Sequence, residues 1–191
     1  MIVDGKSFGE KVRSLRKQKG LTLVELAEKT NRSVSLLSQI ENGNVSPSFS
    51  SMHTIADALE INLGHMIAEE TTTSEEDSFH LRPSARKVLT TQGGLQHQLL
   101  SHGIPLSFEF IILEVPPGAS TGEYLYSHGG EECGLVLEGE LLIETGDQVH
   151  RLKPGDSITL RSSLPHRLAN PGKKKTKAVW VNSAPYIFST Q

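Results

Sequence analysis

The chain has 191 residues, of which 36% are hydrophobic and 21% charged, and its formal net charge is -3. These values are ordinary for a globular protein of one or two domains and exclude a polyanion. A single cysteine, Cys133, excludes an internal disulfide, and no apolar stretch suits a signal peptide or a membrane span, so we expect a cytoplasmic protein with no membrane partner.

The first third of the chain has the apolar spacing of five short helices. The first is predicted over residues 7–19, where Ser7-x-x-Glu10 has the spacing of a capping box, and Gly20 suits its end. Thr22-x-x-Glu25 repeats this spacing for a second helix.

Ser33 suits the N-cap of a third helix, which is predicted to end at Asn42 and Gly43. Ser46 and Pro47 open a fourth helix, and a short fifth is predicted over residues 62–67.

The composition changes at Glu69–Ser78, which is polar, acidic and free of large apolar residues. Such a segment is typical of a linker. We therefore expect a helical domain over residues 1–68, a linker over 69–80, and a second domain over 81–191.

Short β-rich runs separated by Gly, Pro, Asn and Asp follow the linker, and they predict an all-β sandwich or small barrel. The predicted strand segments are LQHQLL, LSFEFIILEV, CGLVLEGELLIET, DSITL and TKAVWVNS.

The second and third helices have the arrangement of a helix-turn-helix, whose second helix places its first turn in the major groove of DNA. Residues 1–45 carry eight Lys or Arg against five acids, and a basic head is typical of nucleic-acid binding. The residues expected to reach base edges are Ser33, Val34, Ser35, Ser38 and Gln39. The residues expected to contact phosphates are Arg32, Asn42, Asn44 and Thr22.

Residues 7–67 resemble the Xre/Cro-type helix-turn-helix family of bacterial and phage repressors. The resemblance rests on Arg16, Gly20-Leu21-Thr22, Glu25-Leu26-Ala27, Leu37-Ser38, Ile40-Glu41-Asn42-Gly43, Pro47, Ile55-Ala56 and Leu59. It implies an all-α, lambda-repressor-like domain of five helices that binds a double-stranded DNA operator, with Arg16 and Glu41 as a structural pair. Since operators usually have two half-sites, we expect a homodimer. The alternative from periodicity alone is a helical bundle used for protein contacts.

The β-rich region contains two histidines and a carboxylate, His128, Glu132 and His166, whose ligand atoms suit Zn, Mn, Fe or Ni. His128-x3-Glu132-x6-Gly139 and Gly155…His166-x3-Asn170 resemble the two motifs of the cupin family. The resemblance implies a cupin double-stranded β-helix, or jelly roll, and a site at these residues.

One cupin ligand position departs from the family pattern, because Tyr126 stands where a histidine is usual. Two interpretations therefore stay open: a metal held by three residues, or a metal-free pocket that binds an organic ligand directly, which we prefer. We expect Cys133 in the core, and Trp180 in the core or a dimer interface.

A helix-turn-helix head followed by a cupin resembles repressors that sense a small metabolite. The stretch PPGASTGEYLYSHGGEECGLVLEGEL is similar to that of the putrescine-utilisation repressor subgroup. The resemblance implies a small-molecule effector such as a polyamine. The residues expected to bind it are Glu123, Tyr126, His128, Glu132 and His166, with Glu131 and Tyr124 as further candidates. The alternative is a metal-dependent cupin oxygenase or isomerase with an autoregulatory DNA-binding head.

Overall fold

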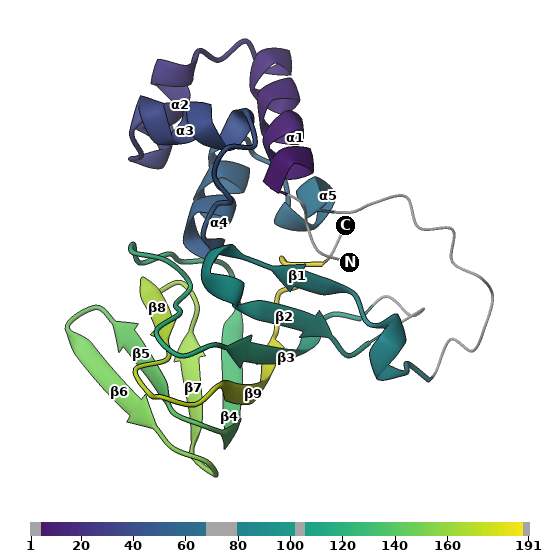
Figure 1. Cartoon of the computed structure of the whole chain (residues 1–191), viewed down its shortest axis with the longest axis vertical. Coiled ribbons are helices and arrows are strands. Elements are labelled where there is room, and N and C mark those ends of the chain that lie inside the picture. The colour runs from purple at the N-terminus through teal and green to yellow at the C-terminus, as the bar shows by residue number, and fades with distance from the viewer. Residues whose placement is uncertain (1–4, 68–79, 102–105, 189–191) are drawn as a thin grey trace.

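The computed structural model describes residues 5–67, 80–101 and 106–188. An all-α head is followed by an antiparallel β domain, which confirms the predicted fold class (Figure 1). The predicted linker, apart from residue 80, lies outside the described residues. No described helix is long and apolar enough to cross a membrane.

The head has the five predicted helices. Helices α2 and α3 begin at the predicted caps, whereas α1 begins at Gly5, before Ser7, and α4 is capped by Ser48 rather than Ser46. In the second helix, Thr22 accepts a hydrogen bond from the Glu25 amide, and the Glu25 carboxylate accepts one from the Thr22 amide. Ser33 caps the third helix by accepting from the Leu36 amide at 3.1 Å. The helices are α1 (Gly5–Gln18), α2 (Leu23–Thr30), α3 (Val34–Glu41), α4 (Phe49–Ala58) and α5 (Leu63–Ile67).

The β domain consists of two antiparallel sheets, one with the strand order β1-β2-β3-β9-β4-β7 and one with the order β6-β5-β8. Two one-turn 3-10 helices, Pro83–Ala85 and Gln92–Gly94, flank its first strand. The strands are β1 (Val88–Thr90), β2 (Gln96–Leu99), β3 (Glu109–Val115), β4 (Glu131–Glu138), β5 (Leu141–Thr145), β6 (Gln148–Leu152), β7 (Ser157–Arg161), β8 (His166–Ala169) and β9 (Thr176–Asn182).

Three strands were not among the predicted segments: β1, β6 and β8. They are short, and β6 has the polar sequence QVHRL, so neither length nor apolar alternation marks them. The single predicted run over residues 133–145 is two strands, because Gly139 turns the chain between β4 and β5 with a φ of 75°.

The head packs directly on the β domain through α4, which reaches down to the strands (Figure 1). The amide of Ser50 in its first turn donates to the Thr121 carbonyl at 2.8 Å. Contact is so close that a Cβ on Gly122 would lie 2.1 Å from the Ser50 hydroxyl. Buried side chains of both domains form one continuous core, and Trp180 is part of it.

Candidate DNA-binding surface and candidate metal centre

The polar residues predicted to read DNA lie on the outer side of α3. Ser33, Val34, Ser35 and Gln39 are exposed, and Ser38 is half-buried. Their apolar neighbours Leu37 and Ile40 are fully buried, so the register of the helix is fixed by the core. This face is therefore available to a DNA groove, while its base contacts stay a prediction.

The predicted phosphate contacts fall into two groups. Thr22, Asn42 and Asn44 are exposed. The side-chain amide of Asn42 donates to the Ser38 carbonyl at 2.8 Å. Arg32 is different, because it is only 9% exposed and its guanidinium carbon lies 3.9 Å from the centroid of the Tyr124 ring. The expected phosphate contact of Arg32 does not fit this arrangement, since the side chain points to the β domain.

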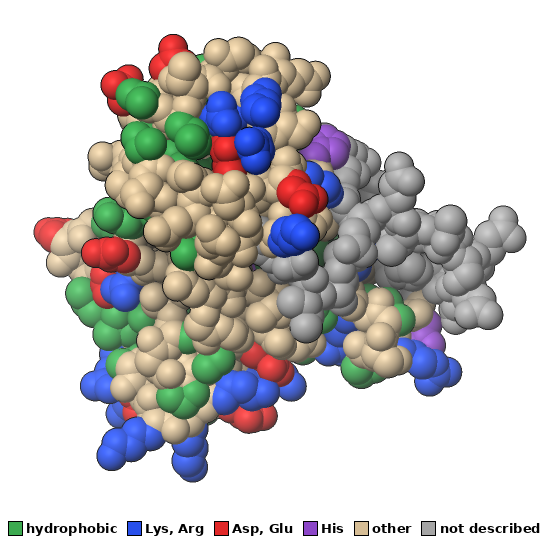
Figure 2. Space-filling view, turned by 45° about the horizontal axis from the view of Figure 1, so that its top comes forward, with side chains coloured by type: hydrophobic (Ala, Val, Ile, Leu, Met, Phe, Trp, Pro, Cys, Tyr) green, Lys and Arg blue, Asp and Glu red, His purple; other side chains and the backbone are tan. Residues whose placement is uncertain are grey.

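The head is only moderately basic at its surface. Figure 2 looks onto the head and shows its Lys and Arg side chains gathered on one part of it, while apolar and uncharged side chains cover much of the rest. Lys and Arg side chains at this place would favour association with DNA phosphates.

Arg16 and Glu41 form the structural pair that the resemblance implied. Arg16 donates to both Glu41 oxygens, at 2.6 and 2.9 Å, and to the Leu21 carbonyl at 2.7 Å. Both side chains are buried, and the hydrogen bonds to Glu41 raise the pKa of Arg16. The pair joins α1 to the end of α3 and so fixes the angle of the recognition helix.

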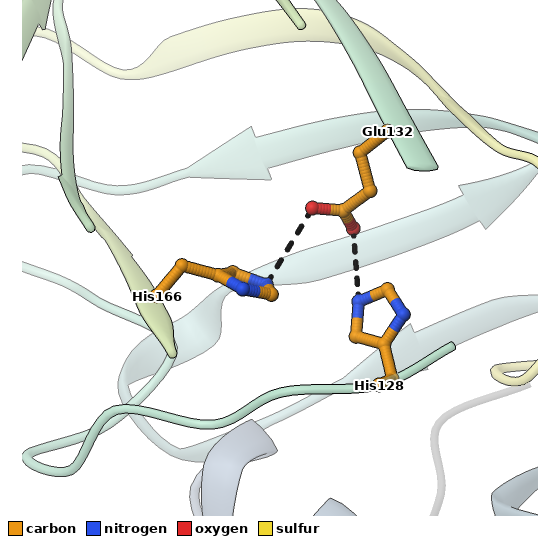
Figure 3. A group of neighbouring side chains, drawn as sticks. All are labelled: His128, Glu132 and His166. Atoms are coloured by element: carbon orange, nitrogen blue, oxygen red, sulfur yellow. Dashed lines mark hydrogen bonds and ion pairs between the residues drawn. The ribbon is translucent and has the colours of Figure 1, made fainter. Parts of the chain in front are cut away.

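In the β domain, His128, Glu132 and His166 converge as the spacing predicted (Figure 3). The ligand atoms of the three side chains all lie within 4.8 Å of one another. His128 Nε2 lies 3.1 Å from Glu132 Oε1, and His166 Nε2 lies 3.5 Å from Glu132 Oε2. The three residues come from different parts of the chain: the loop before β4, β4 itself and the start of β8.

Backbone carbonyls fix the proton positions of the two imidazoles. His128 Nδ1 lies 3.0 Å from the Gly129 oxygen, and His166 Nδ1 lies 2.8 Å from the Leu164 oxygen. A carbonyl only accepts, so each Nδ1 carries a hydrogen. His128 Nε2 hydrogen-bonds to Glu132 Oε1, whereas His166 Nε2 faces Glu132 Oε2 at 3.5 Å.

Two acceptors then face each other without a donor between them. Glu132 Oε2 and His166 Nε2 are buried without a hydrogen-bond partner among the described residues. Burial also lowers the pKa of His166, so a proton is a poor bridge there at neutral pH. A cation satisfies this set, and neutral imidazole with carboxylate is a common donor set for transition metals.

Tyr126, the residue at the departing cupin position, forms a wall of the site and is outside the group of three ligands. Its ring lies 4.4 Å from the His166 ring, centroid to centroid. Burial first, and then the charge of Glu132, raises the pKa of Tyr126 well above its usual value. The phenol is therefore neutral and a poor metal ligand.

No sequence pattern predicted the three aromatic residues that cover the site. Tyr186 stacks on His128 with ring centroids 3.8 Å apart. From α4 of the head, Phe49 packs 5.3 Å from Tyr126, and His53 lies 5.8 Å from His128. The DNA-binding head therefore closes the buried site of the β domain.

The segment that carries Tyr186 is held by Glu109, a buried carboxylate at the start of β3. Glu109 accepts hydrogen bonds from the amides of Ile187 and Phe188, at 2.9 and 2.6 Å, and from the Asn182 amide group at 3.3 Å. Burial raises the pKa of Glu109 despite these bonds.

The expected effector pocket is not one site. The cavity beside Tyr126 and Glu132 has a volume of about 10 Å³, which is room for a single ion or water. Glu123 lies elsewhere, in a cavity of about 520 Å³ between the head and the β domain. Tyr126 is buried beside Glu132, whereas Glu123 and Tyr124 are exposed and line the cavity next to the head.

Cys133 is exposed, so its expected place in the core is wrong. Successive residues of a strand point to opposite faces, and Glu132 points inward, so Cys133 points outward. It belongs to an apolar outer face of the larger sheet, formed by β3, β9 and β4. That face contains Phe110, Ile112, Val179, Val181, Cys133, Leu135 and Leu137.

Comparison with known proteins finds the same two parts. Residues 7–69 match the family described as helix-turn-helix domain, and residues 111–182 match the cupin domain. The chain is 29% identical over 171 residues to the HTH-type transcriptional regulator PuuR of Escherichia coli strain K12, covering 89% of this chain and 91% of that protein.

Two further proteins are similar in part or in fold. The immunity repressor protein of Bacillus phage phi105 is 40% identical over 72 residues, which is 38% of this chain and 50% of that protein. The crystal structure of an HTH_3 family transcriptional regulator from Vibrio cholerae has a TM-score of 0.64 at 23% identity, covering 95% of this chain and 97% of that one. The latter has the same fold.

Proposed function

This chain belongs to the helix-turn-helix transcriptional regulators that carry a C-terminal cupin domain, and from that premise we propose that it is an effector-controlled repressor. The observation that carries this proposal is the docking of the head by α4 on the cupin. Helix α4 packs against α2, the partner of α3 in the helix-turn-helix, and its Phe49 and His53 lie over the cupin site. A change at the cupin therefore changes the placement of the recognition helix.

A small effector is proposed to relieve repression by favouring a head placement with lower operator affinity. A ligand shifts such an equilibrium only through its different affinities for the two placements. The test is a gel-shift titration on an operator selected from random duplexes, with small amines and amino acids added in turn. The coupling is refuted if no compound changes operator affinity while one of them binds the protein tightly.

We also propose that His128, Glu132 and His166 hold one divalent metal ion. The support is the pair of facing acceptors, Glu132 Oε2 and His166 Nε2, neither of which has a hydrogen-bond partner among the described residues. A bound metal would supply positive charge and fix the two imidazoles at that point. The residues' own part is to present both Nε2 lone pairs, oriented by backbone carbonyls at the opposite nitrogen.

Metal content of the purified protein tests the centre. We expect about one metal ion per chain, lost in His166→Ala and in Glu132→Gln but retained in His150→Ala. His150 lies on β6, in the smaller sheet. Wild-type protein without metal, after exposure to Zn, Mn, Fe and Ni salts, would refute the centre.

The enzyme alternative requires room for a substrate beside the metal. The cavity of about 10 Å³ beside Tyr126, Glu132 and Tyr186 supports a regulatory centre instead, since small-molecule sites usually measure hundreds of cubic ångströms. Turnover of an organic substrate by metal-loaded protein, lost in His166→Ala, would favour the enzyme.

We propose that the apolar outer face of the larger sheet joins two copies of the chain. Its side chains lie side by side across three strands, because Val179 pairs with both Ile112 and Leu135, and Val181 pairs with both Phe110 and Cys133. A contiguous apolar patch on a sheet marks an interaction surface. A dimer places two recognition helices on one operator.

A further inference from the structure

Arg32 lies at a point of the head where an extended arginine side chain would meet DNA. It directly precedes Ser33, the N-cap of α3, and the first turn of a recognition helix is the part that enters the major groove. Phosphate oxygens border the groove, and arginine side chains and helix N-termini are their usual protein partners. In this structure, however, Arg32 is only 9% exposed and its guanidinium faces the β domain.

The guanidinium of Arg32 has few hydrogen bonds where it lies. Its Nη1 donates to the carbonyls of Thr30 and Asn31, at 3.2 and 3.1 Å, and both bonds stay within its own turn. Its Nε is buried without a partner among the described residues. Burial is also the largest influence on the pKa of Arg32 and lowers it. A phosphate group provides the paired acceptors that this guanidinium lacks.

The contact that keeps Arg32 in this place comes from the cupin. The guanidinium carbon lies 3.9 Å from the centroid of the Tyr124 ring, which is cation-π geometry. Tyr124 belongs to the loop between β3 and β4, so the contact joins the two domains. The charge of Glu123, the preceding residue, also favours the guanidinium. Because an aromatic face does not satisfy the N–H donors of a guanidinium, a phosphate can take its place.

We propose that Arg32 is a phosphate-binding residue that the cupin keeps away from DNA, and that Tyr124 is the residue that positions it there. The Tyr124 ring and a DNA phosphate compete for the same guanidinium, so the contact between head and cupin sets part of the operator affinity. This inference rests on the proposed function only for operator binding by the head. It requires neither an effector nor a metal ion.

Gel shifts of the full chain on its operator, repeated over a range of salt concentrations, test this competition. Tyr124→Leu removes the aromatic face and should tighten operator binding about two- to fivefold, the range expected for an exposed cation-π contact. Arg32 then reaches one more phosphate, so the slope of log affinity against log salt should steepen by about 0.9. Unchanged or weaker operator binding by Tyr124→Leu would overturn the inference.

Two further variants of this loop serve as controls. Tyr124→Phe keeps the aromatic face and should bind the operator as the wild type does. Leu125→Ala is the matched neighbour, because Leu125 is 40% exposed and Tyr124 is 43% exposed. It should change neither the operator affinity nor the salt slope. Equal tightening by Leu125→Ala would assign the effect to the loop as a whole and overturn the role of the Tyr124 ring.

Arg32→Gln shows whether Tyr124 acts through the guanidinium. In the Arg32→Gln background, Tyr124→Leu should have no effect on operator binding, because no guanidinium remains to be released. In the Tyr124→Leu background, Arg32→Gln should reverse the tightening and remove the additional salt dependence. Tightening by Tyr124→Leu that persists without Arg32 would overturn the competition for this guanidinium.

The same measurements separate this inference from the proposed function. Operator affinity that changes with a small molecule, but is equal in wild type and Tyr124→Leu, supports effector control and refutes the role of Tyr124. Operator affinity that depends on Tyr124 and Arg32 as expected, while a tightly bound compound leaves it unchanged, supports the role of Tyr124 and refutes effector control. A full chain that selects no operator from random duplexes refutes both.

Discussion

At the scale of single residues, Arg16 and Glu41 have a structural role, which differs from the role of the exposed side chains around them. Their pair is buried and closes on Leu21, so loss of one partner leaves an uncompensated charge in the head. Glu41→Ala should lower the free energy of unfolding by about 3–5 kcal/mol in urea titration. Lys19→Ala, which removes an exposed pair with Glu60, should cost less than about 1 kcal/mol. Equal losses of unfolding free energy in the two variants would show that the buried pair contributes no more than the exposed one.

Gln39 is the residue of the exposed α3 face best suited to adenine. Gln39→Ala should weaken operator binding by about 1–3 kcal/mol and relax the base preference at one position. Binding to an operator library measures both effects. Unchanged affinity and preference would mean that α3 does not lie in the groove as proposed. Glu28→Ala, an exposed change on α2, serves as the control.

His97 gives the stability a pH dependence. Burial lowers its pKa to about 3, so the folded chain holds it neutral while the unfolded chain protonates it near pH 6.5. Above pH 6.5, His97 is neutral in both the folded and the unfolded chain and does not change the stability. As the pH falls from 6.5 toward 3, protonation of His97 in the unfolded chain lowers the free energy of unfolding. Between pH 7 and pH 5 the loss should be about 2 kcal/mol. Urea titrations at the two pH values should show that the wild type loses about 2 kcal/mol more of its free energy of unfolding than His97→Gln does. An equal loss in the two proteins would contradict the burial argument.

At the scale of elements, α1 and α3 approach each other at a glycine. A Cβ on Gly9 would lie 2.0 Å from the Ile40 carbonyl oxygen, which belongs to the backbone of the recognition helix. Gly9→Ala should therefore push α3 outward, cost about 1–3 kcal/mol of stability and weaken operator binding.

Gly129→Ala is the matched control for that substitution, because open space surrounds the added methyl. Thermal unfolding and gel shifts report the two effects. An unaltered Gly9→Ala protein would show that α3 tolerates a shift against α1.

Helices α2 and α3 were predictable because each has local signals: a capping side chain at its start, an apolar stripe and an asparagine at its end. The strands β1, β6 and β8 were not, because they are short and no apolar alternation marks them, and β8 also pairs with β5 rather than with a strand next to it in the chain. The outward direction of Cys133 was available in principle, because Glu132 was expected to point inward and neighbours on a strand alternate.

Only part of the candidate metal centre could be predicted. His128, Glu132 and His166 follow a family spacing, which is a local property of the chain. Phe49, His53 and Tyr186 reach the same point through packing between domains and through the segment held by Glu109. No spacing in the sequence predicts that these side chains lie together. The separation of Glu123 from the candidate metal centre depends on the same packing between the domains.

At the scale of the whole molecule, the proposed dimer depends on the outer face of the larger sheet. Leu135 lies in the middle of this outer face and is 40% exposed, so Leu135→Lys would bury a charge in the proposed interface. We expect a monomer by sedimentation velocity and a large loss of operator affinity. Val149→Lys, at an exposed position of the smaller sheet, should remain a dimer. A Leu135→Lys dimer would assign the contact to another surface.

The continuous core has a consequence for dividing the molecule into fragments. Phe49 is fully buried and its ring packs on His97, Tyr126 and Tyr186 of the cupin, so cutting the chain between the domains would expose apolar surface on both pieces. An isolated head would expose the apolar ring of Phe49. An isolated cupin would expose the cluster of His128, Glu132 and His166 to water. A DNA affinity or a metal affinity measured on either fragment would then describe a different chemical environment from that of the intact chain.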